Sequence, residues 1–278
     1  MLFQYNIMFT FIIPICVKNI IHLRQLSRCI NSIRTYHPKN KIILINDSDD
    51  LFDISDIFKN DENLYVEKTL NRGSADQQVF KFFLEKDTND TGFIMQDSMI
   101  LNKRLENVEN VENIKFLWHF TNHIRHWDII NEPITDYNVN NSINTHTDFI
   151  KHCLVKNYGD NLSFLNYALN ALDNKETWCG CFGNCCIINR QTLLLMDSKI
   201  KFIDKFINYT TNRERRVNES IFALFCHFLF TDINFNDSYD GLYYDGIHEN
   251  KESGTPTGFD NLVWCRKKEY ISKISFDR

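Results

Sequence analysis

A carboxylate at the end of a short apolar run is the residue in this sequence best placed for chemistry. The run 93–95 is typical of a buried strand, and Gln96, Asp97 and Ser98 follow it directly. Carboxyl ends of strands are where α/β folds hold ligands, and a buried unpaired carboxylate is costly. We therefore interpret Asp97 as the ligand of a divalent cation, Mn²⁺ or Mg²⁺, that in turn holds a diphosphate. The alternative is that Asp97 caps a turn or the next helix.

A second candidate metal ligand is His248, in the glycine- and aspartate-rich tail 239–259. A neutral imidazole is a suitable Mn²⁺ ligand beside carboxylates. A loop near the end of the chain can fold back over a bound nucleotide. The alternative is a structural histidine, which is the commoner role.

Glu214 and Glu219 open the last long predicted helix, where arginines are also concentrated. A carboxylate there can act as a general base toward an acceptor hydroxyl, and nearby arginines can bind phosphate or lower the pKa of the carboxyl group. We favour Glu219 over Glu214 as the base. The alternative is a solvated first turn whose acidic residues suit the helix dipole.

The segment 177–188 combines aromatic residues, glycines and thiols. Gly180 and Gly183 would let a ligand or another backbone segment approach closely. Trp178 and Phe182 would then present a platform to the face of a sugar, unless they are ordinary core residues. The four cysteines lack the spacing of a zinc knuckle, and thiols also pack well as small hydrophobic groups.

The first hundred residues predict the scaffold for these side chains. Asn19 can cap a helix after the first strand, and Ser74 with Gln77 has the spacing of a capping box. The order of elements is β-α-β-α-β-α-β, which predicts one parallel sheet with helices on both faces. The apolar runs that we interpret as strands are 9–16, 41–45, 64–66 and 93–95.

Polar turns follow three of these strands, at 18–19, 46–50 and 96–98. The carboxyl ends of parallel strands share one edge, so we expect a nucleotide to bind there. The sequence has neither a GxGxxG motif after the first strand nor a P-loop, which points to carboxylates and a metal as the phosphate-holding groups.

The pattern changes after residue 101. We expect one domain over 1–278, with a nucleotide-binding half (1–101) and an acceptor-binding α+β half (102–278). Within the second half the sequence predicts a surface helix or loop at 102–113, an aromatic strand at 116–120, a long loop at 130–148, and helices at 161–172, 190–196 and 217–230.

Composition narrows the function classes. The 278 residues are 43% hydrophobic, with a net charge of −5 and scattered basic residues, which argues against a nucleic-acid partner. No apolar run reaches the length of a membrane span, and we interpret 1–15 as leading into the first strand, not as a signal peptide. Nine cysteines fit reduced thiols in a cytoplasmic compartment. The wealth of Asn, Ile and Lys suggests an AT-rich genome, such as that of a large DNA virus.

Together these segments resemble the GT-A family of nucleotide-sugar glycosyltransferases. The opening TFIIPICVKN and the run KIILINDSDD are similar to the start of its family-2-like members. The segments FLWHF, WCGCFGNCCII, RERRVNES and DGIH resemble an uncharacterised viral and microbial branch. The resemblance implies a Rossmann-like, mostly parallel sheet, with Gln96, Asp97 and Ser98 at the place of the DxD motif. The second carboxylate of that motif is missing here.

The same resemblance implies roles for further residues. The first strand, at Pro14 and Ile15, would hold the nucleoside with Asp47. Asn19 would lie at the same edge. Arg72 and Gly73 would lie beside the base and the pyrophosphate.

Three hypotheses follow from these readings. The first is a metal-dependent glycosyltransferase that moves a hexose from a UDP-sugar to a glycan or glycoprotein hydroxyl, as a monomer or a homodimer. The second is a non-catalytic module of the same fold that binds a nucleotide or a glycan. The third is a sugar-nucleotide nucleotidyltransferase, which normally has a Gly-rich basic loop after the first strand that is absent here.

Overall fold

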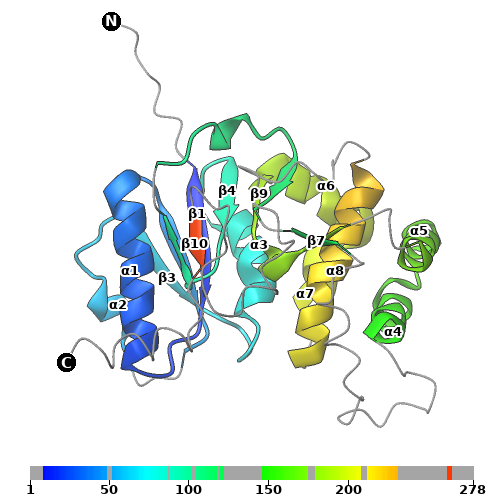
Figure 1. Cartoon of the computed structure of the whole chain (residues 1–278), viewed down its shortest axis with the longest axis horizontal. Helices are drawn as coiled ribbons and strands as arrows, with labels where there is room; N and C mark the ends of the chain where they lie inside the picture. Colours follow the sequence, from blue (N-terminus) through cyan, green and yellow to red (C-terminus); the bar gives the residue numbers. More distant parts are fainter. Residues whose placement is uncertain are drawn as a thin grey trace, which may run out of the picture.

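A six-stranded sheet forms the centre of the molecule, with the order β3-β2-β1-β4-β9-β6 (Figure 1). The computed structural model describes residues 9–48, 52–86, 88–101, 104–117, 119–121, 146–174, 179–207, 212–230 and 262–264. The first four strands along the chain are mutually parallel, β9 runs antiparallel to β4, and β6 runs antiparallel to β9. The predicted α/β class with a mostly parallel sheet is therefore confirmed. The strands are β1 (Thr10–Ile15), β2 (Ile42–Asn46), β3 (Leu64–Lys68), β4 (Thr91–Ile94), β6 (Ile114–Phe116) and β9 (Cys186–Asn189).

Helices cover both faces of the sheet, as the β-α-β order requires (Figure 1). One face packs against α1 (Ile20–Tyr36) and α2 (Ile54–Ile57). The other packs against α3 (Ala75–Glu85), α6 (Arg190–Ile200), α7 (Phe202–Ile207) and α8 (Asn212–Leu229). The helices α4 (His146–Tyr158) and α5 (Leu162–Asp173) pack on the far side of α8.

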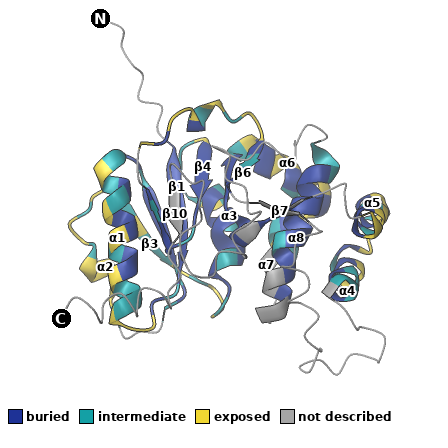
Figure 2. Cartoon of the chain, in the orientation of Figure 1, coloured by how far each residue is buried: buried dark blue, intermediate teal, exposed yellow. Residues whose placement is uncertain are grey.

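The hydrophobic core divides into two clusters, one on each face of the sheet (Figure 2). Along β1, Ile12 belongs to one cluster while Phe11 and Ile13 belong to the other. Successive side chains of a strand point to opposite faces, so a strand covered on both sides must be apolar throughout. This is the physical reason that the continuous apolar runs predicted central strands correctly.

Two small sheets lie beside the main one. β5 (Met99–Leu101) pairs with β10 (Leu262–Trp264), and β7 (His119–Thr121) pairs with β8 (Cys179–Cys181). The expected single strand at 116–120 is wrong, because its two ends belong to β6 and β7 in different sheets. Helix α4 already begins at His146, so the expected loop 130–148 ends earlier, and its part before 146 lies outside the described residues. None of the described helices is long and apolar enough to cross a membrane.

The helix starts show one correct and one incorrect prediction. The Asn19 side chain accepts hydrogen bonds from the backbone N–H groups of Ile21 and His22, both at 3.0 Å, so it caps α1 as predicted. Ser74 does not cap α3 with its side chain. Its hydroxyl donates to the carbonyl of Asn71 and accepts from the amide of Gln78, so these two contacts replace the expected capping hydrogen bond.

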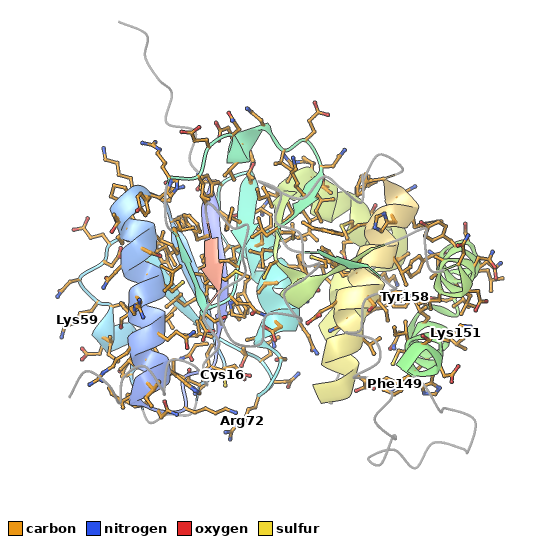
Figure 3. All side chains as sticks on the ribbon, viewed as in Figure 1. Cys16, Lys59, Arg72, Phe149, Lys151 and Tyr158 are labelled. Carbon is orange, nitrogen blue, oxygen red and sulfur yellow. The ribbon has the colours of Figure 1, made fainter. Side chains whose placement is uncertain are left out.

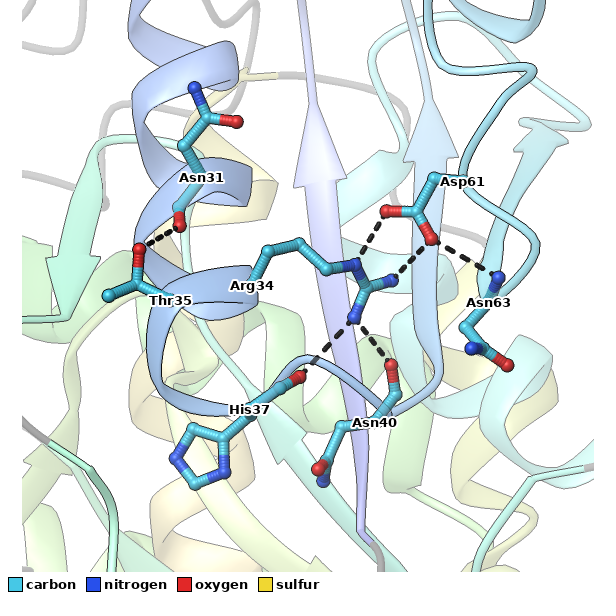
Figure 4. Close-up of polar contacts among 7 residues, drawn as sticks. All are labelled: Asn31, Arg34, Thr35, His37, Asn40, Asp61 and Asn63. Atoms are coloured by element: carbon cyan, nitrogen blue, oxygen red, sulfur yellow. Dashed lines mark hydrogen bonds and ion pairs between the residues drawn. The ribbon is translucent and has the colours of Figure 1, made fainter.

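An ion pair between Arg34 and Asp61 lies at the end of the sheet where its parallel strands begin (Figure 4). The Arg34 guanidinium donates to both carboxylate oxygens of Asp61, at 2.5 and 2.9 Å, and to the carbonyl of Asn40 at 2.7 Å. The two charged side chains are only 19% and 22% exposed. This bidentate pair joins the end of α1 to the segments that precede β2 and β3.

His37 follows α1 and is buried as a neutral imidazole. Its Nε2 accepts a hydrogen bond of 3.0 Å from the backbone N–H of Leu105. Burial, followed by the positive charge of Arg104, lowers the pKa of His37 to about 4. Protonation would place a hydrogen on the nitrogen that accepts this bond, so the fold selects the uncharged form.

Candidate functional site

The topology of the sheet marks the place where a ligand is expected. The chain proceeds outward from β1 to β2 and β3, and the crossover through α3 then places β4 on the other side of β1. In open α/β sheets, ligands bind at such a switch point, outside the carboxyl ends of the strands. The switch point here lies between β1 and β4.

The two strands at the switch point also stop pairing before their ends. β1 pairs with β2 as far as Ile15, whereas its pairing with β4 ends at Ile12 and Ile94. Pro14 lies beyond this point, and its missing N–H falls on the β4 side, since Ile12 accepts from Met95 on that side. Pro14 and Ile15 are both buried in β1. The carboxyl ends of β1 and β4 are thus released from each other.

Asp47 makes several hydrogen bonds at the carboxyl ends of β1, β2 and β3. It follows β2 and is 8% exposed. Its Oδ1 accepts from the backbone N–H of Gly73 at 2.7 Å and from the hydroxyl of Thr69 at 3.1 Å, while its own N–H donates to the carbonyl of Ile15 at 2.9 Å. Asp47 therefore joins the ends of three neighbouring strands, with its carboxylate bound to the loop after β3 and its backbone N–H bound to the end of β1.

The loop between β3 and α3 is fixed by hydrogen bonds at Leu70 and Gly73, on either side of Arg72. The backbone position of Arg72 is therefore well defined. Gly73 has a φ of 83°, a backbone conformation that glycine adopts readily. On the other side, Gln78 accepts from the backbone N–H of Leu70 at 3.1 Å. Arg72 is exposed at the lower edge of the molecule, the edge that also carries Cys16 at the end of β1 (Figure 3).

Asp97 lies in a tight turn at the switch point. The backbone N–H of Met99 donates to the carbonyl of Gln96 at 3.0 Å, so Asp97 and Ser98 form the centre of a turn between β4 and β5. Each of the two is only 6% exposed. Burial, followed by the negative charge of Asp97, raises the pKa of the Cys29 thiol far above its usual value. The carboxylate is thus near the buried face of α1.

A second group of polar residues forms on the other side of this turn. Gly183 has a φ of 60°, and a Cβ atom built there would lie 2.3 Å from the side-chain nitrogen of Gln96. The amide of Gln96 therefore rests directly on the backbone of Gly183. The glycines of segment 177–188 were predicted to let a ligand or another backbone segment approach, whereas the group that approaches Gly183 is the side chain of Gln96.

The buried thiol of Cys185 lies where this group meets α3 and α8. Burial raises the pKa of Cys185 well above its usual value, and the nearby Cys186, Asp76 and Glu219 raise it further, while the Gln96 backbone opposes the rise. Asp76 belongs to the first turn of α3 and Glu219 to α8. Gln96 thus contacts Gly183, and Glu219 belongs to the helix α8 that packs against the same turn.

Glu214 lies on a different side of α8 from this group. It is 3% exposed and pairs with Lys156 of α4 at 3.3 Å. Glu219 is partly exposed and lies near Cys185 and Asp76. That Glu219, and not Glu214, serves as the general base stays a prediction.

Two predicted site residues, Trp178 and His248, lie outside the described residues. In the part of the chain that the structure does describe, no group of three or more His, Cys, Asp or Glu side chains is arranged to hold a metal ion. Asp97 can therefore contribute one ligand, but the described side chains do not complete a metal centre by themselves.

The sequence reasoning did not single out Asp76 or the buried amides Gln77, Asn184 and Asn218 as site residues, and it weighed Cys185 only as a zinc ligand or a small core residue. Asp76 follows the loop of Arg72 by four residues, and its position in a first helical turn was the available signal. Nothing in the spacing indicated that this turn would lie beside α8, because the two helices are more than a hundred residues apart.

Comparison with known proteins gives likenesses in structure and none in sequence. The sequence matches no protein-family model and no curated protein. The mannosyltransferase Ktr4p from S. cerevisiae, in complex with GDP, is 10% identical with a TM-score of 0.43 over 78% of this chain and 67% of that chain.

Two other solved structures are also similar. A galactosyltransferase, LgtC, in complex with donor and acceptor sugar analogs, is 8% identical with a TM-score of 0.38 over 77% of this chain and 70% of that one. S. aureus TarS is 14% identical with a TM-score of 0.30 over 49% of this chain, which spans 39% of that TarS chain. At these identities and scores the likeness does not assign an activity to this chain.

Proposed function

We propose that this protein transfers a sugar from a nucleoside-diphosphate donor to a hydroxyl acceptor. One observation carries the proposal: the buried Asp97 turn lies at the β1/β4 switch point, where the pairing of these strands has ended. In this proposal, Asp47 and the residues that it binds, Thr69 and Gly73, form the nucleoside side of the site. Asp76, Gln96 and Glu219 form the reacting side.

Asp47 and Arg72 serve the nucleotide in this proposal. Asp47 holds the Gly73 backbone in place, and Arg72 extends from the loop so fixed. An arginine provides donors in a geometry that suits phosphate oxygens. Pro14, Ile15 and Asn19 lie at or after the end of β1 and border the same nucleoside region.

Glu219 acts as the general base in the form of the reaction that inverts the sugar. Its carboxylate accepts the proton of the acceptor hydroxyl as that oxygen attacks the anomeric carbon, while the bond to the diphosphate breaks. Glu214 is less suited because its carboxylate is already paired with Lys156. The leaving diphosphate carries negative charge that must be stabilised as it departs.

The finer proposal is that the donor is a UDP-hexose, the acceptor a glycan or glycoprotein, and the reaction dependent on Mn²⁺ or Mg²⁺. Asp97 would hold this ion with His248 and the oxygens of the diphosphate, since the described side chains do not complete a metal centre. Such an ion would neutralise charge on the leaving group.

A second candidate function is that of a non-catalytic module that binds a nucleotide or a glycan. The observation in its favour is that Ser98 and Met99 follow Asp97, where a second carboxylate would be expected for metal binding. Such a module would bind nucleotide without any response to metal.

The test is calorimetric titration of UDP into the protein with and without Mn²⁺, followed by a turnover assay with UDP-sugars. The key variant is Asp97→Asn, and the matched control is Asp90→Asn, which changes an exposed carboxylate just before the same strand β4. We expect Mn²⁺-dependent binding that Asp97→Asn removes and Asp90→Asn retains. Binding that ignores Mn²⁺ would refute the metal assignment and favour the module. No binding of UDP, GDP or CDP would refute the transferase and leave the module that binds a glycan.

A further inference from the structure

Several buried polar atoms of the described residues have no hydrogen-bond partner, and most of them lie in one region. Gln77 and Asn218 lack partners for both the oxygen and the nitrogen of their side-chain amides, Asn184 lacks one for Oδ1, and Ser220 lacks one for its hydroxyl. All four residues are at most 2% exposed. Native proteins leave few such atoms unsatisfied, so a concentration of them calls for an explanation.

These residues belong to the segments that carry the group at the reacting side of the proposed site. Gln77 is next to Asp76 in α3, Asn184 is next to Cys185, and Asn218 and Ser220 flank Glu219 in α8. Helix α8 packs against both α3 and the turn 182–184. The unpartnered amides therefore come from the same three segments that converge on Cys185.

The cluster is reached through its more exposed neighbours. Asp76, Gln96 and Glu219 are each partly exposed, whereas the amides next to them are buried. Partly exposed polar residues and buried amides therefore alternate along the segments that pack between α3 and α8. A ligand group that passes Asp76 and Glu219 would meet both donors and acceptors.

The polar groups of Gln77, Asn184, Asn218 and Ser220 indicate which class of ligand would bind there. An anion is disfavoured, because Asp76 and Glu219 would repel it. An apolar group is disfavoured, because it would leave the buried amides without partners. A hydroxyl group both donates and accepts a hydrogen bond, so a neutral molecule with several hydroxyls satisfies donors and acceptors together. A sugar ring has this property.

We propose that the buried amides of Gln77, Asn184 and Asn218 bind the hydroxyls of the transferred sugar and determine which sugar is accepted. The assignment rests on the proposed function, and deepens it by naming the groups that recognise the sugar. It also implies that the ligand-free protein is less stable than it would be with apolar side chains at these positions. A site built to hydrogen-bond a hydroxyl discriminates strongly against a substrate that lacks it.

The first part of the test measures the melting temperature of variants in which an apolar side chain of similar shape replaces a buried amide. Gln77→Met keeps both the length of the side chain and the helix propensity, so it removes little besides the unpartnered amide. Asn218→Leu does the same with a gain in helix propensity. Replacing an unsatisfied buried polar group by an apolar one of similar shape is neutral or stabilising. We expect the melting temperature of each variant to rise by about 2–6 °C.

The binding arm compares UDP with UDP-glucose, UDP-galactose and UDP-N-acetylglucosamine by calorimetry. The wild type should bind one of the nucleotide sugars more tightly than UDP. Gln77→Met and Asn218→Leu should each reduce this gain by about fivefold or more while binding UDP as before. The control is Gln25→Met, which removes a buried amide from α1 on the other face of the sheet and should leave the gain unchanged.

The outcomes separate this assignment from the proposed function. Higher melting temperatures together with a lost preference for the sugar would support it. Lower melting temperatures, an unchanged preference, or a wild type that binds UDP with no gain from any sugar would refute the assignment and leave nucleotide binding intact. A wild type that binds neither UDP nor a nucleotide sugar would refute both.

Discussion

Replacing Asp47 by alanine tests whether one carboxylate organises the nucleoside side of the site. The change removes the acceptor of two hydrogen bonds, from the backbone of Gly73 at 2.7 Å and the hydroxyl of Thr69 at 3.1 Å. A hydrogen bond to a charged group contributes about 1.5–3 kcal/mol. Gly73 and Thr69 are partly exposed, so water replaces part of this loss, and we expect the free energy of unfolding to fall by about 2–4 kcal/mol.

The assay is thermal unfolding combined with hydrogen exchange and UDP titration. The melting temperature of Asp47→Ala should fall by roughly 5–10 °C, the Gly73 amide should lose its protection, and the affinity for UDP should fall by about tenfold or more. Asp47→Asn should show a smaller loss, because its amide oxygen can still accept both bonds without the charge.

The matched control is Asp53→Ala, which removes the N-cap of the short helix α2. Asp53 accepts one hydrogen bond, from the N–H of Asp56 at 3.0 Å, at an exposed position, so it should cost only about 1 kcal/mol and leave UDP binding unchanged. If Asp47→Ala were no more destabilising than this control, or if it bound UDP as tightly as the wild type, the role of Asp47 as the organising carboxylate would be refuted.

Three further predictions concern other parts of the fold. Arg34→Ala should lower the free energy of unfolding by about 2–4 kcal/mol in urea titrations but leave UDP affinity unchanged, because the pair lies at the opposite edge; reduced affinity would contradict this placement. Gly183→Ala should reduce sugar transfer, since its Cβ would displace the amide of Gln96; the double variant with Gln96→Ala should be less impaired than additivity predicts, and strict additivity would argue against the contact. His37 has a folded-state pKa of about 4, below the 6.5 of the unfolded chain, so the stability it contributes is present above pH 6.5 and is lost as the pH falls from 6.5 toward 4. Urea titrations from pH 7 to pH 4 should show a steeper loss for the wild type than for His37→Gln, and equal slopes would refute the neutral buried form.

Much of the first half of the fold was predictable from local patterns. The strand β1 was visible because a strand covered on both faces must be apolar throughout, and the cap of α1 because Asn19 precedes an apolar stripe. The position of Asp97 at the end of a buried strand followed from the same reasoning. Each of these features depends on residues that are close in the sequence, so it can be predicted without the tertiary structure.

Local patterns failed where distant segments decide the structure. Ser74 has the spacing of a capping box, yet its side chain is engaged by Gln78 and Asn71 in a loop that Asp47 holds from another strand. The aromatic run 116–120 was expected to form one strand, but its ends pair with β9 and with β8. The partners of the run 116–120 lie sixty or more residues away in the sequence, and the loop around Ser74 is held by Asp47, which contacts Gly73 across 26 residues.

The sequence by itself determined the class of the fold and the carboxylates at the ends of its strands. Its apolar runs require a sheet buried on both faces. Asp47 directly follows β2, and Asp97 lies three residues beyond the end of β4. Only the tertiary structure decided that Asp76, Gln96 and Glu219 meet around Cys185 and that unpartnered amides lie next to them. The physical reason is that this meeting depends on the packing of α8 against α3 and the turn 182–184, and the pattern of a single helix specifies which face is apolar but not which distant helix covers it.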